Sequence, residues 1–209
     1  MRKQTTYSER APLPALAITY LGPPIRSNDG PALSLLAEIL SGGESSRLYE
    51  KMVYEQQVVQ SVFCDTDLRE DLGIIAFRLV LASGKTVAEA EESLNTEIEK
   101  VLKDGVTDAE LDKAKNRFVT GKLLERETFN GKASALGQAV VVYGDPDRVN
   151  TDLEKLQAVT AAEIKEVMNR YITGKKKVVL EYLPESMKPG AASAKPPGRS
   201  ASPSDKTKS

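Results

Sequence analysis

The chain has 209 residues and a formal charge of −1, because 29 lysines and arginines nearly balance 30 acidic residues. This length is enough for one domain with a sizeable core, and the balanced charge makes neither nucleic acid nor an anionic membrane an expected partner. Histidine is absent, which excludes histidine-based catalytic triads, imidazole proton shuttles and histidine metal sites. No membrane span is expected, since the longest apolar run, residues 139–143, is far too short for one.

A strand at residues 15–21 is the first regular element that the pattern predicts, bounded by prolines and by Gly22-Pro23-Pro24. Its nearly continuous apolar character favours burial on both faces. Residues 1–14 show turn and strand residue types without a helical period. An amphipathic helix follows, with Asp29 as its expected N-cap and Pro31 in its first turn.

This helix is predicted to end at Gly42 and Gly43, and a second helix starts directly after them. Glycine ends helices because it tolerates the left-handed backbone conformation. Ser45 or Ser46 is expected to accept hydrogen bonds from free amides at the start of the second helix. Three apolar side chains of the second helix are predicted to turn inward: Leu48, Met52 and Val53.

A phosphate-binding loop is the alternative for this glycine pair, since amides at a helix start attract anions. Such loops place a lysine after the last glycine, whereas this chain has Glu44 there. An apolar helix, rather than a strand, also precedes the turn. A helix corner is therefore the favoured interpretation.

Residues 58–65 and 74–82 are rich in β-branched and aromatic side chains and are predicted to pair as a hairpin. The single cysteine, Cys64, lies in the first of these strands and is expected to be a buried structural thiol. A solvated link between the strands is favoured over a calcium loop, because its acidic residues do not follow the twelve-residue spacing. Those acidic residues are Asp65, Asp67, Glu70 and Asp71.

Three later helices each begin with threonine followed three residues on by glutamate, which is the capping-box pattern. The pairs are Thr86 with Glu89, Thr107 with Glu110, and Thr160 with Glu163. The second of these helices is expected to direct five apolar residues to the core: Leu111, Ala114, Phe118, Leu123 and Leu124. Another helix is predicted at about 132–143, a short one from Thr151, and a closing strand at 177–183.

This order of elements predicts an α+β fold, a two-layer sandwich of a mostly antiparallel sheet packed on helices. One domain is expected over residues 1–184. Residues 185–209 are rich in proline, serine and lysine and are expected to form a disordered tail.

Three segments together resemble the insulinase/pitrilysin family of zinc metallopeptidases: the strand end 20–24, the corner 42–49 and the helix opening 107–115. The likeness is greatest to the C-terminal, non-zinc domain of bacterial members related to the mitochondrial processing peptidase. It covers about residues 14–184. The fold it implies is the half-domain of the processing-peptidase type, two of which enclose a chamber for an unfolded peptide.

In that family zinc lies in the first half, on an inverted motif of histidine, two residues, glutamate and histidine. This chain lacks the motif, so the resemblance implies the half with no catalytic residue, no metal ligand and no cofactor of its own. Zinc is expected in a partner, which would be a preceding N-terminal domain or a homologous subunit. The implied substrate is a peptide or unfolded protein, and exported bacterial relatives suggest the periplasm.

The second half of active members contributes an arginine and, seven positions later, a tyrosine that hold substrate and the developing oxyanion. The matching positions here are Val53 and Gln60. Gln60 can still hydrogen-bond a peptide carbonyl. Arg47 and Tyr54 are separated by the same seven residues, but ordinary helix periodicity accounts for that spacing, since Arg47 already belongs to the corner motif. Arg47, Tyr54 and Gln60 are therefore the substrate-side candidates. The alternatives are that Arg47 braces the corner and that Tyr54 packs with its hydroxyl at the rim.

Two functions from different classes follow. The first is the non-catalytic, substrate-chamber half of a zinc-dependent endopeptidase. The second is a catalytically inactive structural or assembly subunit that keeps the peptidase fold, which the loss of the arginine and tyrosine at Val53 and Gln60 favours. An unrelated α+β binding module is a third alternative, since a fold does not fix a function.

Overall fold

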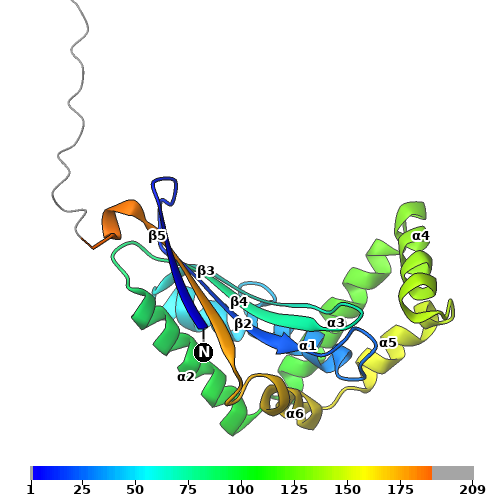
Figure 1. The fold of residues 1–209 in the computed structure, drawn as a ribbon. Helices are drawn as coiled ribbons and strands as arrows, with labels where there is room; N and C mark the ends of the chain where they lie inside the picture. The colour runs from blue at the N-terminus through cyan, green and yellow to red at the C-terminus, as the bar shows by residue number, and fades with distance from the viewer. Residues whose placement is uncertain (1, 190–209) are drawn as a thin grey trace, which may run out of the picture.

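The structure, a computed structural model, describes residues 2–189 as a five-stranded sheet with helices on one of its faces (Figure 1). The strands are β1 (Arg2–Ser8), β2 (Ala15–Gly22), β3 (Val59–Asp67), β4 (Gly73–Leu81) and β5 (Lys177–Pro184). The α-helices are α1 (Gly30–Ser41), α2 (Val87–Asp104), α3 (Asp108–Glu125), α4 (Phe129–Gln138), α5 (Arg148–Ala158) and α6 (Ala161–Tyr171). Two π-helical segments, η1 (Tyr49–Glu55) and η2 (Ala139–Tyr143), and a 3₁₀ turn, η3 (Glu185–Met187), complete the list.

The strand order is β1-β5-β2-β4-β3. The pair β1 and β5 is parallel, and the three other pairs are antiparallel. The predicted α+β class with a mostly antiparallel sheet is therefore confirmed, as are the hairpin of β3 with β4 and the closing strand β5. The edge strand β1 lies in the N-terminal region for which the sequence pattern predicted no element.

One face of the sheet is buried under α1, α2 and α6, which contact β3, β4 and β2 respectively. Alternate residues of each strand point into this core, and in β2 they are Leu16, Ile18 and Tyr20. Phe77 of β4 is fully buried there and meets the Tyr20 ring edge-on at 6.3 Å between centroids.

The other face of β2 is not buried, which corrects the prediction of burial on both faces. Ala15, Ala17 and Thr19 are half-buried, and Leu21 is exposed. An apolar residue on a strand can face solvent where no second layer covers it, so composition alone did not reveal the open face.

The helix starts follow the predicted capping boxes closely. Thr86, Thr107 and Thr160 each accept a hydrogen bond from the backbone amide of the glutamate three residues on, and each glutamate bonds back. Asp29 does precede α1, but its side chain makes no capping bond, contrary to the prediction. Its carboxylate instead accepts from Arg170 and Tyr171 of α6, each at 2.6 Å.

Helix α3 is only partly a core helix. Its first half buries Leu111 and Ala114 as predicted, and Phe118 packs against the core from a half-buried position. Leu123 and Leu124 are 54% and 58% exposed, so their predicted core role is wrong. The last turns of α3 extend past the end of the sheet toward α4 (Figure 1), and no core lies there for them to enter.

The helix predicted at 132–143 is α4 followed by η2, and it begins three residues earlier, at Phe129. It ends at Gly144, in the left-handed conformation. The predicted tail begins at residue 185, where the structure has the turn η3; residues 190–209 lie outside the described part. Among residues 2–189, no helix is both long and apolar enough to cross a membrane.

Candidate functional site

The corner, residues 42–49, joins α1 to η1 and is the segment that carries the family resemblance. Gly43 has φ of +97°, a backbone conformation that glycine adopts at little cost. The Ser46 hydroxyl donates to the Gly43 carbonyl at 2.6 Å. Neither the Ser45 nor the Ser46 hydroxyl accepts a bond from a helix amide within the described residues, which corrects the expected capping role; Ser46 accepts from the Glu50 amide only through its backbone carbonyl, at 2.9 Å.

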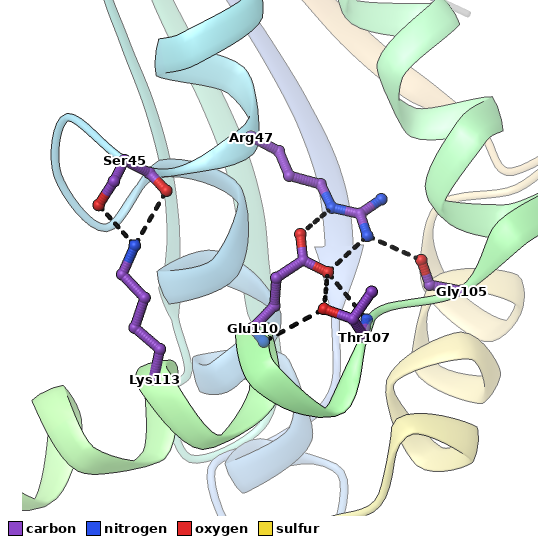
Figure 2. Close-up of polar contacts among 6 residues, drawn as sticks. All are labelled: Ser45, Arg47, Gly105, Thr107, Glu110 and Lys113. Carbon is purple, nitrogen blue, oxygen red and sulfur yellow. Dashed lines mark hydrogen bonds and ion pairs between the residues drawn. The ribbon is translucent and has the colours of Figure 1, made fainter.

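Arg47 lies against the first turn of α3 (Figure 2). Its guanidinium forms a bidentate ion pair with Glu110, with Nε–Oε1 at 2.5 Å and Nη2–Oε2 at 2.7 Å. Nη2 also donates to the Gly105 carbonyl at 3.0 Å. Such fork-to-fork pairing fixes both side chains in one geometry, so Arg47 ties the corner to the start of α3.

Glu110 also forms the capping box of α3 with Thr107, whose backbone amide and hydroxyl each donate to Oε2 at 2.8 Å. These charge-assisted bonds, that from Arg47 first, lower the pKa of Glu110 from its ordinary 4.5 to about 2. The carboxylate therefore stays ionised at neutral pH. The Arg47 charge is matched by it and is not presented to an anionic ligand.

Two more basic residues of α3 hold the corner from the same side. Lys113 Nζ donates to the Ser45 carbonyl at 3.1 Å, as Figure 2 shows. Arg117 donates to the Gly42 carbonyl and pairs with Glu38 at 2.9 Å. Positions 110, 113 and 117 lie on one helix face. This spacing is the sequence signal from which the contacts between α3 and the corner could have been predicted.

The three substrate-side candidates occupy different surroundings. Arg47 is bound to Glu110, Tyr54 on η1 is 77% exposed, and Gln60 is exposed on β3 beside a bulge in the ladder with β4. No hydrogen bond or ion pair joins any two of them within residues 2–189. Val53, at the position of the family's arginine, is half-buried against the core.

Cys64 is buried, as predicted, and burial raises the pKa of its thiol. Its backbone amide donates to Ser41 Oγ at 2.8 Å, and its carbonyl accepts from the same hydroxyl at 3.1 Å. Ser41, at the end of α1, thus satisfies both outward backbone groups at this point of the edge strand β3. Edge strands covered in this way are protected against pairing with another chain.

Two of the four acidic residues near the β3–β4 link, Asp65 and Asp67, pair with arginines. Asp65 lies 3.0 Å from Arg78, and Asp67 lies 2.7 Å from Arg69. In the part of the chain that the structure describes, no cluster of three or more histidine, cysteine, aspartate or glutamate side chains is placed to hold a metal ion.

The open face of the sheet is the most extended candidate surface. Cross-strand register places Phe63, Arg78, Ala17 and Leu180 in one row across it. Several of its apolar side chains are exposed: Leu21, Phe63, Val178, Leu180 and Tyr182. An apolar surface of this kind can bind apolar side chains of an extended peptide.

These features define a class: an α+β domain, a mostly antiparallel sheet with helices on one face, whose described residues hold no metal cluster. The arginine of its corner, Arg47, is held in an ion pair with Glu110. The model of the peptidase M16 inactive domain matches residues 2–118, more than half of the chain. The chain therefore belongs to the peptidase M16 inactive-domain family, and the resemblance to the C-terminal, non-zinc half is confirmed.

An uncharacterised zinc protease of Mycobacterium tuberculosis is 28% identical over 142 residues, covering 68% of this chain and 32% of that protein. An Arabidopsis thaliana protein named as a mitochondrial-processing peptidase alpha subunit is 27% identical over 131 residues, 63% of this chain and 26% of its own length. The chain thus spans between about a quarter and a third of the length of these curated relatives.

Two solved structures have the same fold. A protease from Helicobacter pylori superimposes with a TM-score of 0.81 at 19% identity, covering 87% of this chain and 44% of that one. The inactive peptidase domain of a Bordetella parapertussis protein gives 0.75 at 22% identity, covering 92% and 98%.

Proposed function

We propose that this domain is the non-catalytic, substrate-chamber half of a zinc-dependent endopeptidase and acts with a histidine-bearing N-terminal domain or partner subunit. Zinc and the catalytic glutamate belong to that other half. The proposal has two supports: the chain has no histidine, and its family is the inactive domain of zinc proteases.

The observation that carries the proposal is the open apolar face of the sheet. It offers a row of contact positions across β3, β4, β2 and β5, and its exposed charge is partly neutralised by the pair of Arg78 with Asp65. A chamber wall must bind unfolded peptides of varied sequence, and shape-tolerant apolar contact suits that task. The Ser41 bridge to Cys64 closes the middle of the β3 edge, so we expect peptides to lie on the face.

The first test mixes the purified chain with the histidine-bearing half and a fluorogenic peptide. The chain alone is expected to bind no stoichiometric zinc and to cleave nothing, whereas the two halves together cleave the peptide. Tight zinc binding or cleavage by the chain alone would contradict the proposal.

A second test places charge on the open face of the reconstituted enzyme. The double variant Phe63→Lys with Leu180→Lys is expected to lower kcat/KM for an apolar peptide at least tenfold, mainly through KM, because apolar contact is lost. Leu72→Lys, an exposed leucine in the β3–β4 link, is the matched control and should leave the value unchanged. Equal effects of the two changes would argue against the open face.

The second candidate function is a structural or assembly subunit. It is favoured by Val53 and Gln60 at the positions where active members have arginine and tyrosine, and by the engagement of Arg47 with Glu110. The discriminating measurement is cleavage by the assembled halves. A stable complex that cleaves nothing, and that gains activity only with Val53→Arg and Gln60→Tyr, would support this role.

A further inference from the structure

A cavity of about 820 Å³ lies between α4, α5, the end of α3, the start of α1 and the β3–β4 link. Helix α4 stands past the end of the sheet at which this link lies (Figure 1). More of the cavity wall is apolar than polar, and Phe118, Ala139 and Leu156 are among its apolar residues. Cavities of about 300–1,000 Å³ with mostly apolar walls and a few polar groups are typical ligand sites.

The charged groups of the cavity wall leave one positive charge without a partner. Each carboxylate of the wall is held by a basic side chain at 2.5–2.7 Å, and the pairs are Glu125 with Lys122, Asp152 with Arg148, and Asp67 with Arg69. Arg126 is the one basic residue of the wall that has no carboxylate partner within residues 2–189. It is half-buried, and its Nη1 donates to the Val149 carbonyl at 2.7 Å. A partly desolvated cation of this kind favours an anionic ligand.

The neutral polar groups of the wall indicate what carries the anion. Several of these side chains make no hydrogen bond within residues 2–189, namely Ser34, Thr66, Asn130, Ser134 and Gln138. A plain acyl chain in the cavity would leave these donors and acceptors without partners, which is unfavourable. The amides of a peptide can donate to them and accept from them. The wall therefore suits a peptide carboxylate better than a fatty acid.

We propose that the cavity binds the carboxyl-terminal end of a peptide with apolar last residues, an inference that rests on the proposed function and names the part of the substrate that is bound. Arg126 pairs with the terminal carboxylate, and the apolar wall takes the last side chains. The cavity adjoins the open face of the sheet. Alternation along β3 places Phe63, Asp65 and Asp67 on that face, and Asp67 also lines the cavity. A peptide that lies on the face can thus reach the cavity with its end.

The first test measures fluorescence anisotropy of a labelled peptide that ends in alanine, valine, leucine and phenylalanine. It is made once with a free terminal carboxylate and once with a terminal amide. We expect the chain to bind the free acid about tenfold or more tightly than the amide, because only the acid pairs with Arg126. Arg126→Gln is expected to raise the Kd of the acid to that of the amide and to leave the Kd of the amide unchanged.

Lys132→Gln is the matched control for charge. Lys132 is exposed on α4 and lies outside the cavity wall, so its replacement removes the same charge without touching the site. It should change neither Kd by more than about twofold. An effect of Arg126→Gln no larger than that of Lys132→Gln would overturn the inference, as would equal affinity of the wild-type chain for acid and amide.

A second pair of variants tests the cavity without altering Arg126. Ser134→Trp places a large ring in the cavity from α4 and is expected to raise the Kd of both peptides at least tenfold. Ala133→Trp, at an exposed neighbouring position outside the wall, should leave both unchanged. Circular dichroism checks that all variants remain folded. Equal effects of the two tryptophans would place the peptide elsewhere and overturn the inference.

Dodecanoate, a carboxylate on a plain acyl chain, distinguishes a lipid acid from a peptide end. If the chain binds dodecanoate more tightly than the free-acid peptide, the site is one for a lipid acid and the inference is overturned. The proposed function is decided separately, by cleavage with the assembled halves. Cleavage combined with equal binding of acid and amide leaves that function standing without this site. Binding that depends on Arg126, without cleavage, leaves the site standing without that function.

Discussion

The corner at residues 42–49 and the helical arm at residues 123–143 are both attached to α3, yet they are stabilised in opposite ways. At the corner, Arg47, Lys113 and Arg117 bind carbonyl and carboxylate oxygens across α1 and α3, and Leu48 is fully buried. In the arm, α4 has no buried residue, and its apolar side chains face outward. The corner is fixed by contacts within this domain, whereas the apolar side chains of α4 have no such cover.

The largest difference between the two regions is expected when a large apolar side chain is truncated and the loss in the free energy of unfolding is compared. Leu48→Ala at the corner is expected to lower the free energy of unfolding by about 2–5 kcal/mol, because it leaves a cavity in a packed core. Phe129→Ala in the arm, where the ring is almost fully exposed, should change it by less than about 0.5 kcal/mol. Urea unfolding of both variants measures the contrast, and a comparable loss in the two would refute it.

The ion pair of Arg47 with Glu110 should contribute a pH-dependent part of the corner's stability. The pKa of Glu110 is lowered from 4.5 to about 2, so its ionised form stabilises the fold fully above about pH 4.5, and this stabilisation is lost as the pH falls through 2. Glu110→Gln is expected to cost about 1–2 kcal/mol at pH 7. The cost should shrink steadily between pH 4.5 and pH 2.

Arg47→Met in the same unfolding series provides the matched comparison. The double variant should be less destabilised than the sum of the single ones, because the two side chains interact directly. Additive costs, or a cost of Glu110→Gln that is independent of pH, would mean that the pair contributes nothing to stability.

Replacing a glycine by alanine should change the free energy of unfolding in opposite directions in the two regions. Gly43→Ala is expected to destabilise the corner by about 1 kcal/mol or more, since φ is +97° and a Cβ would lie 2.6 Å from Arg117 Nη1. Gly137→Ala in α4 should stabilise by about 0.5–1 kcal/mol, because a Cβ there meets nothing within 4 Å and alanine favours the helix. Thermal unfolding of the two variants gives the signs directly.

The smallest effect is expected for chemical labelling of Cys64, which lies beside the corner and whose backbone is hydrogen-bonded to Ser41. Burial raises the pKa of the thiol, so little reactive thiolate forms at neutral pH. A thiol reagent should label Cys64 slowly in the native protein and rapidly in denaturant. Fast labelling of the native protein would show that β3 opens locally. The corner region would then not be more rigid than the arm, and the comparison would fail.

Much of the fold was predictable from local sequence signals. The capping boxes at Thr86, Thr107 and Thr160 depend on residues three positions apart, and the β3–β4 hairpin on alternating apolar residues. The roles of Leu123, Leu124 and Asp29 were not predictable in this way. An apolar period says that a helix has an apolar face, but not whether a core lies next to it.

The candidate site divides along the same line. Some of its features could be identified from the sequence, because each depends only on residue type: the glycine pair, the missing histidine and the residues at positions 53 and 60. The pairing of Arg47 with Glu110 joins residues 63 positions apart. Long-range pairing depends on how α1 and α3 pack, which no local pattern encodes.

The sequence by itself determined the fold class, the family resemblance and the lack of histidine chemistry, since composition, short spacings and element order are properties of the chain alone. Only the tertiary structure decided which apolar side chains are covered: those of β2 on one face, those of α3 in its first half and none of α4. The physical reason is that burial depends on what lies opposite a side chain in space, and that neighbour is set by the packing of the whole domain.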